Sequence, residues 1–391
     1  MSTPFVVGYR DLHPNTIVNF QLNRWISYLG EEAVGEITPV LPKLTDLAAF
    51  RREFLALSGR AEAAGRLAAA AYYLRSAEFF MFADDPGKAA ARQRFLELIW
   101  KANGLTAASR QLLPYQDGQR AGFLPAYRFP AGGEQRGSIV LHGGGDSYIE
   151  EFFPVLSPFT AAGYEVIAFE GPGQGGALEE SGLPMTPDWH RPVKIVLDHF
   201  GLDDVTLVGV SMGGCLVLRA AALEPRVKRA VAYDVLYDNS DMWFGRLDPP
   251  VRALIRGLLA ARARGVLDAL VSRSASRSMG LEWAVRQGMH LAGATSFYDY
   301  LRAIERFTTR DISPLVKQHV LVMAGAGDWA IPLDQYYRQL AALTGARSVT
   351  GRLFTRAEQA HQHCQVGNLK LALDFILDWI AFHTAEDDQA A

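Results

Sequence analysis

The stretch VGVSMGG, residues 208–214, decides the fold of this chain. It places Ser211 between two glycines, directly after the apolar run VTLVG (205–209) and directly before the helix-like run CLVLRAAALE (215–224). In the pattern G-x-S-x-G, a strand passes into a helix through a very sharp turn that exposes the serine oxygen. Side chains at either glycine would collide with neighbouring backbone. The stretch therefore predicts a nucleophile elbow, and the alternative is an ordinary loop serine between flexible glycines.

The composition is that of an ordinary globular protein, with 391 residues, 49% of them hydrophobic and 21% charged. This length suggests one large domain with additions, or two domains. The net charge of -3 gives no general attraction to nucleic acid or to anionic membranes. The two cysteines, Cys215 and Cys364, are too few for a disulfide framework or a metal cluster. We therefore expect a small-molecule substrate, no nucleic-acid or membrane partner, no cofactor and no metal.

The first residues, MSTPFVVGYRDLHPN (1–15), lack the basic segment and long apolar run of a signal peptide. No apolar run in the sequence approaches the length of a membrane span. These features predict a soluble cytoplasmic protein.

The chain divides into two textures. Residues 1–110 read as a helical N-terminal domain, because segments 44–84 and 84–102 are rich in Ala, Leu, Arg and Glu with apolar spacings of three and four. From 111 onward, short apolar runs alternate with helix patterns, which predicts βαβ units and a mostly parallel, doubly wound α/β sheet.

A helical segment interrupts this alternation at 237–310, where a lid over the sheet edge would lie. We call residues 237–310 the lid. The expected domains are the N-terminal helices (1–110), the first part of the core (111–236), the lid (237–310), the second part of the core (311–385) and a C-terminal tail (386–391).

The glycine-rich loop His142-Gly143-Gly144-Gly145-Asp146 follows the strand-like run SIVL. Such a loop can turn backbone N–H groups inward, where one of them and the N–H after the nucleophile bind an oxyanion. We assign Gly144, with Gly145 beside it, and Met212 to this oxyanion hole. The alternative is an ordinary flexible turn.

Two further segments supply a carboxylate and a base. Asp328 in GAGDWAIP sits at the C-terminal end of a strand, where the ligand sites of parallel sheets lie and where it can orient a histidine. EQAHQHCQVGN offers His361 and His363, and we prefer His363 because it immediately precedes the last helix. The order Ser211, Asp328, His363 is the one expected for a serine triad of the α/β-hydrolase type. A helix-cap role for the aspartate is the alternative.

GPGQGG (171–176) formally satisfies a dinucleotide-binding motif. The sequence that follows, ALEESGLPMTP (177–187), is a poor helix, and the next strand leads to the serine elbow. We therefore expect a tight loop near the mouth of the active site.

Other charged residues admit two interpretations each. Near the nucleophile, a second carboxylate could deliver a proton to a leaving group, whereas surface solvation is the simpler interpretation. The carboxylates concerned are Glu150, Glu151, Asp234 and Asp238. The arginines of the lid could favour an anionic substrate or carrier, although a solvated helix face is the better interpretation. They are Arg252, Arg256, Arg262, Arg264, Arg273 and Arg277.

Together these pieces resemble the α/β-hydrolase superfamily over residues 111–385. Four motifs resemble the group of 2,6-dihydroxypseudooxynicotine hydrolase and the fungal polyketide-shortening pigment hydrolases. They are FEGPGQG (169–175), MTPDWH (185–190), ARSVTGRLF (346–354) and EQAHQHCQVGN (358–368). The resemblance implies hydrolysis of a carbon–carbon bond beside a ketone by a serine triad, often on an aromatic or polyketide substrate, and a homodimer. The sequence of the lid cannot be matched to that group.

The lid and the N-terminal helices are expected to enclose a mainly apolar pocket above Ser211, because a nucleophile at the edge of a sheet is otherwise open to water. The substrate-binding candidates are Trp243, Phe244, Met289 and Asp234. Retro-Claisen cleavage is the first hypothesis. An esterase, lactonase, acyltransferase or cyclase with the same acyl-enzyme is the second, and a non-catalytic small-molecule receptor is the third.

Overall fold

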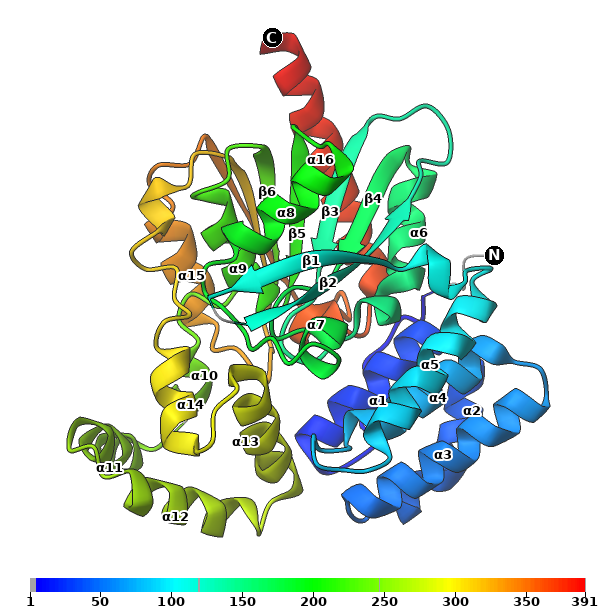
Figure 1. Cartoon of the computed structure of the whole chain (residues 1–391), viewed down its shortest axis with the longest axis vertical. Coiled ribbons are helices and arrows are strands. Elements are labelled where there is room, and N and C mark those ends of the chain that lie inside the picture. The colour runs from blue at the N-terminus through cyan, green and yellow to red at the C-terminus, as the bar shows by residue number, and fades with distance from the viewer. Residues whose placement is uncertain (1–4, 119, 246, 391) are drawn as a thin grey trace.

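The computed structural model describes residues 5–118, 120–245 and 247–390, in which eight strands form one central sheet (Figure 1). The strand order is β1-β2-β4-β3-β5-β6-β7-β8; β2 pairs antiparallel with β1 and β4, and the remaining pairs are parallel. The strands are β1 (Gln111–Asp117), β2 (Arg120–Phe129), β3 (Gly137–His142), β4 (Tyr164–Phe169), β5 (Val205–Val210), β6 (Val227–Tyr233), β7 (His319–Gly325) and β8 (Ser348–Phe354). The α/β fold class expected from the sequence is confirmed.

The central strands are buried on both faces, which explains their continuous apolar runs. Every residue of β4, β5 and β7 is buried, as parallel strands covered by helices on both sides require. β1 was not expected from the sequence. It carries Pro114 and pairs only with β2, and the edge of a sheet is where a strand tolerates proline.

Five α-helices precede the sheet. They are α1 (Thr16–Leu29), α2 (Glu32–Ile37), α3 (Leu47–Ala63), α4 (Leu67–Phe79) and α5 (Lys88–Ala102), with 3-10 turns at Thr38–Lys43 and Ala107–Ser109. Asn15 caps α1 by accepting the N–H groups of Ile17 and Val18. All residues of α1 from Val18 to Tyr28 are buried, so this helix lies inside the molecule, where it can form a wall of the active site.

Other helices flank the sheet or form the lid. Around the sheet lie α6 (Phe153–Ala161), α7 (Gly175–Glu179), α8 (His190–Phe200), α9 (Gly213–Ala221), α15 (Asp334–Ala342) and α16 (Leu369–Ala390), with 3-10 turns at Ile149–Phe152, Ser313–Leu315 and His363–Gln365. The lid contains α10 (Ser240–Phe244), α11 (Pro249–Ala260), α12 (Arg264–Ala275), α13 (Met279–Ala292) and α14 (Phe297–Ile304). The lid leaves the sheet after β6 and returns before β7.

The lid and the N-terminal helices lie side by side below the sheet in Figure 1. Trp283 of α13 stacks on Phe79 of α4 with ring centroids 4.7 Å apart, and its indole N–H donates to the carbonyl of Phe79 at 3.0 Å. These contacts join the lid to the N-terminal helices.

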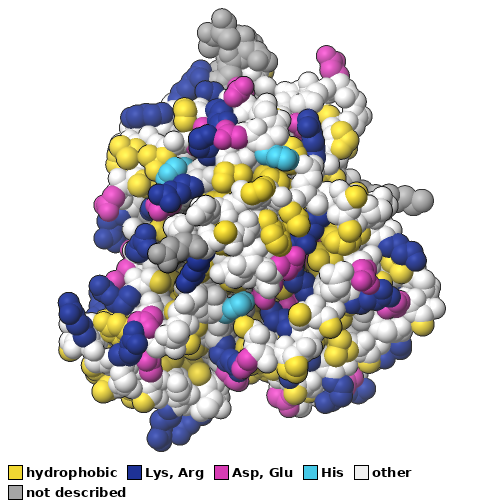
Figure 2. All heavy atoms as spheres, in the orientation of Figure 1, with side chains coloured by type: hydrophobic (Ala, Val, Ile, Leu, Met, Phe, Trp, Pro, Cys, Tyr) yellow, Lys and Arg dark blue, Asp and Glu magenta, His cyan; other side chains and the backbone are white. Residues whose placement is uncertain are grey.

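The end of the chain and the surface of the lid bear on two expectations. Residues 386–390 continue α16, so the expected tail at 386–391 is not a separate segment there, and residue 391 lies outside the described residues. Figure 2 shows basic side chains gathered over the lid, where Arg262, Arg273 and Arg277 are exposed. No helix among the described residues is both long and apolar enough to cross a membrane.

Candidate active site

The elbow places Ser211 between β5 and α9 with a backbone φ of +61°, in the left-handed region that ordinary residues seldom adopt. A Cβ atom on Gly209 would lie 2.1 Å from the carbonyl oxygen of Gly213, and one on Gly213 would lie 2.7 Å from the carbonyl oxygen of Gly143. Neither position accepts a side chain, which is the reason for the two glycines of the motif.

Ser211, His363 and Asp328 form a continuous hydrogen-bonded chain. The Oγ of Ser211 lies 2.8 Å from Nε2 of His363, and Nδ1 of His363 lies 2.7 Å from Oδ2 of Asp328. Because a carboxylate only accepts, Nδ1 carries a proton and Nε2 is left to accept from the serine. The other oxygen of Asp328 accepts the N–H groups of Ala330 and Ile331 at 2.6 and 2.9 Å, which fixes the carboxylate.

His361 lies outside this chain. Its ring packs edge-on against Tyr9, with centroids 6.0 Å apart, and its carbonyl accepts the N–H of Gly327. The structure therefore gives His363, and not His361, the position beside Ser211.

The electrostatics of the triad stabilise the positive charge that His363 acquires as a base. Burial alone would lower the pKa of His363, but the charge of Asp328, aided by Cys364 and Asp234, raises it well above its usual value. Burial pushes the pKa of Asp328 upward, yet the positive charge and hydrogen bond of His363 hold it below its usual value. Asp328 therefore stays ionised and stabilises the imidazolium that forms when His363 takes the proton of Ser211.

The glycine loop lies against the elbow. A Cβ atom on Gly144 would be 2.8 Å from the carbonyl oxygen of Val210 and 3.0 Å from the nitrogen of Met212. Within the described part of the chain, the N–H groups of Gly144, Gly145 and Met212 donate to no protein acceptor. They are thus available to bind an oxygen anion next to Ser211.

Gln174 holds this loop in place, a role that the sequence did not reveal. Its amide NH₂ donates to the carbonyls of Gly143 and Gly144 at 2.6 and 3.1 Å, and its oxygen accepts the N–H of Gly171. Because the two carbonyls are tied to Gln174, the peptide planes of the loop are fixed. The glycine-rich run GPGQGG thus supports the oxyanion loop instead of opening a dinucleotide site.

Two cavities meet at the nucleophile. The inner cavity lies between α1 and the sheet. The outer cavity lies under the lid. Four residues line both cavities: Phe20, Asp146, Ser211 and His363. The reactive oxygen therefore sits at the junction of two separate spaces, each walled mainly by apolar side chains.

The lining of the outer cavity includes one of the three lid residues expected there and lacks the other two. Trp243 lines the outer cavity and donates its indole N–H to Tyr300 at 2.9 Å. Phe244 and Met289 do not line it, because they pack into the lid's own apolar cluster. The residues that do line it from the lid are Asn239, Met242, Trp243, Trp283, Ala284, Gln287, Gly288, Leu291, Ala292, Tyr300, Ile304 and Phe307.

Asp234 was expected to bind substrate, and its placement does not support this. Its side chain is buried beneath the triad and lines neither the inner nor the outer cavity. One oxygen of its carboxylate instead lies 3.2 Å from Nδ1 of His363.

The other candidate carboxylates have partners within the protein. Glu151 is buried and accepts from Arg24 and Arg75, while Glu150 is buried and accepts from Tyr127. Asp238 pairs with Arg310. None of the three lines the inner or the outer cavity, so a role as proton donor to a leaving group has no support from their placement.

Comparisons with known proteins identify the family and the fold. Residues 139–360 match a family described as the alpha/beta hydrolase fold. The hydrolase acrC of Aspergillus aculeatus is 30% identical over 81% of this chain and 83% of its own, and the hydrolyase poxO of Penicillium oxalicum is 30% identical over 74% and 77%. The crystal structure of 2,6-dihydroxy-pseudo-oxynicotine hydrolase has a TM-score of 0.61 and 18% identity over 92% of this chain and 94% of its own, which shows a shared fold.

Proposed function

This chain belongs to the α/β-hydrolase family, and from that premise we propose that it is a serine hydrolase that cleaves a carbon–carbon bond next to a ketone. The family resemblance inferred from the sequence is confirmed, and so is the assignment as a hydrolase enzyme. The proposed substrate is a 1,3-diketone or aryl ketone of aromatic or polyketide-like character.

The observation that carries the proposal is the meeting of two apolar cavities at Ser211 and His363. A ketone flanked by a large apolar group on each side fits this arrangement, with its carbonyl at the junction. Enclosure also suits the chemistry, because a carbanion-like leaving group must be protonated before water reaches the acyl-enzyme.

The reaction follows the hydrogen-bonded chain. Oγ of Ser211 attacks one carbonyl while Nε2 of His363 takes its proton, and the oxyanion binds the N–H groups of Met212 and Gly144. The carbon–carbon bond then breaks, and its electron pair forms the enolate of the second carbonyl. The imidazolium of His363 protonates that enolate, which gives a ketone.

Water completes the cycle. His363 takes a proton from a water molecule that attacks the acyl group on Ser211, and it returns that proton to the serine as the carboxylic acid leaves. Asp328 stabilises the imidazolium in both halves. An ester or lactone substrate would pass through the same acyl-enzyme and is the second candidate.

Matched substrate pairs test the proposal. Each pair contains a 1,3-diketone, R–CO–CH₂–CO–R′, with apolar groups on both sides and the ester of matched size, R–CO–O–CH₂–R′, that carries the same two apolar groups. We expect the diketone to give an acid and a methyl ketone, with kcat/KM equal to or above that of the ester. Hydrolysis of the esters with all diketones recovered unchanged would identify an esterase instead.

A further inference from the structure

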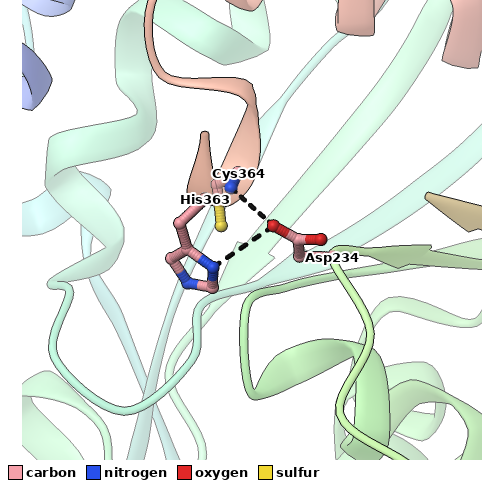
Figure 3. Close-up of side chains that lie close together, drawn as sticks. All are labelled: Asp234, His363 and Cys364. Atoms are coloured by element: carbon pink, nitrogen blue, oxygen red, sulfur yellow. Dashed lines mark hydrogen bonds and ion pairs between the residues drawn. The ribbon is translucent and has the colours of Figure 1, made fainter. Parts of the chain in front are cut away.

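A second carboxylate lies beneath the base. Asp234 directly follows β6, with a backbone φ of +55°, and its side chain is buried. Figure 3 shows this carboxylate pointing at both His363 and the backbone of Cys364. Its Oδ2 lies 3.2 Å from Nδ1 of His363 and accepts the N–H of Cys364 at 2.6 Å.

We propose that Asp234 is a positioning residue that shares the Nδ1–H of His363 with Asp328, so that two carboxylates instead of one orient and charge the base. The inference rests on the proposed role of His363 as the base for Ser211. It does not depend on which bond the enzyme cleaves.

The geometry places the three groups in one shared hydrogen bond. Nδ1 of His363 lies 2.7 Å from Oδ2 of Asp328 and 3.2 Å from Oδ2 of Asp234, so the nearer oxygen is the primary acceptor and the farther one the secondary acceptor. Asp234 also controls the backbone next to the base, because Cys364 has a left-handed φ of +49° and its N–H is bound by this carboxylate. The ring and its turn are therefore held by the same side chain.

Charge around the base supports a division of labour. The titratable groups that face Asp234 and His363 are Asp328, Cys364, Tyr233 and, beyond Tyr233, Tyr28. Burial, followed by the negative charge of Asp328, raises the pKa of Asp234 to about 6. Above that pH both carboxylates are ionised and flank the imidazole ring, and the three groups titrate as a unit.

Cation binding is a different interpretation of the same cluster. Asp234, His363 and Cys364 offer ligand atoms that lie within 4.8 Å of one another. Nδ1 of His363 faces two carboxylates and carries the proton between them, so its lone pair is not available to a cation. The hydrogen-bonded arrangement therefore favours a positioning role.

The test measures the rate at which a fluorophosphonate labels Ser211 across pH, which reports on the serine and its base without any natural substrate. The variants are Asp234→Asn, Asp328→Asn and the double variant. Asparagine keeps an oxygen that can accept the N–H of Cys364, so the fold is preserved, and thermal unfolding checks this. Asp238→Asn is the matched control, because that residue lies on the same loop but pairs with Arg310.

Two carboxylates predict a specific pattern of rates. Where one carboxylate alone holds the histidine, the asparagine variant loses about 10⁴-fold in kcat. Here we expect the labelling rate of Asp328→Asn to be lower than that of the parent by about 100-fold or less. The labelling rate of the double variant should be lower by about 10⁴-fold. The labelling rate of Asp234→Asn should fall by less than about tenfold. The acid limb of its pH profile of labelling should move to lower pH, because the loss of an anion lowers the pKa of His363.

Two results would overturn the proposal. One is a full loss of about 10⁴-fold in Asp328→Asn that the double variant does not deepen. The other is an acid limb in Asp234→Asn that coincides with those of the parent and Asp238→Asn. If the fluorophosphonate labels the parent enzyme but the enzyme cleaves no diketone, the proposed substrate is contradicted and this inference still stands.

Discussion

At the residue scale, local backbone geometry dictates the identity of the two glycines that flank the nucleophile. Gly209 and Gly213 can be predicted from the sequence, because a Cβ atom at either position would lie within 3 Å of backbone atoms. The roles of Gln174 and Asp234 could not be predicted from the sequence, because their contacts join segments that are distant in sequence. A glutamine among glycines has no local pattern that announces its partner.

The nucleophile assignment predicts the behaviour of Ser211→Ala. The variant should lose on the order of 10⁶ in kcat, the loss seen where a triad serine has been removed, because no other group can form the acyl-enzyme. Thermal unfolding should be unchanged or slightly improved, since alanine leaves the glycines and the strand intact. Turnover near that of the parent would exclude Ser211 as nucleophile.

His142 predicts a pH dependence of stability. Burial lowers the pKa of its ring to about 4 from 6.5, and Nε2 accepts the indole N–H of Trp189 at 3.0 Å, which requires the neutral ring. Between those pH values the unfolded chain binds a proton that the folded chain excludes, so stability falls as pH drops from about 6.5 towards 4.

The loss in the free energy of unfolding caused by His142 amounts to at most about 3 kcal/mol at pH 4. Urea unfolding of the parent and of His142→Asn at pH 7 and pH 5 measures it. The free energy of unfolding should decline less in the variant over this interval. Parallel declines in the two proteins would show that His142 does not titrate as described.

At the element scale, the sequence indicated the existence of the lid but not which of its faces meets the substrate. Apolar spacing marks the buried face of a helix, yet the lid has two buried faces. The first buried face packs on the lid itself and contains Phe244 and Met289. The second lines the outer cavity and contains Trp243. Helix α1 presents the same ambiguity, because every residue from Val18 to Tyr28 is buried.

The outer cavity predicts the effect of filling it from α13. Ala284→Trp should lower kcat/KM for bulky diketones far more than the rate of labelling by a small fluorophosphonate, because added volume displaces the substrate arm and leaves Ser211 intact. Ala269→Trp on the exposed side of α12 is the matched control and should change neither rate. Equal losses for both probes in Ala284→Trp would place the substrate elsewhere or indicate a damaged triad.

At the scale of the whole molecule, buried ion pairs join the N-terminal helices to the core. Glu151 accepts from Arg24 and Arg75 and caps the N–H of Tyr148 at 2.8 Å. Arg24 also lines the inner cavity. The sequence could not pair these charges, because the partners are separated by up to 127 positions. The helical domain is therefore a structural wall of the active site.

This network predicts a strong effect of Glu151→Gln. Removing the charge takes a buried anion away from two buried arginines, whose other partners are Asp146 and Glu78, and breaking a buried ion pair typically costs about 3–5 kcal/mol. Glu62→Gln, at an exposed pair with Arg94, is the control and should cost less than about 1 kcal/mol. Chemical denaturation followed by tryptophan fluorescence measures both, and equal small losses would show that the buried pairs do not hold the two parts together.

The central claim is that Ser211 takes an acyl group from a ketone by breaking a carbon–carbon bond. The most direct measurement is rapid quenching of the enzyme with a panel of 1,3-diketones, followed by peptide mass spectrometry and analysis of the released ketone. The account predicts that the peptide containing Ser211 gains the mass of one acyl arm, while one equivalent of the methyl ketone from the other arm appears. Acylation of Ser211 by activated esters, with no acyl mass and no ketone from any diketone, would contradict it.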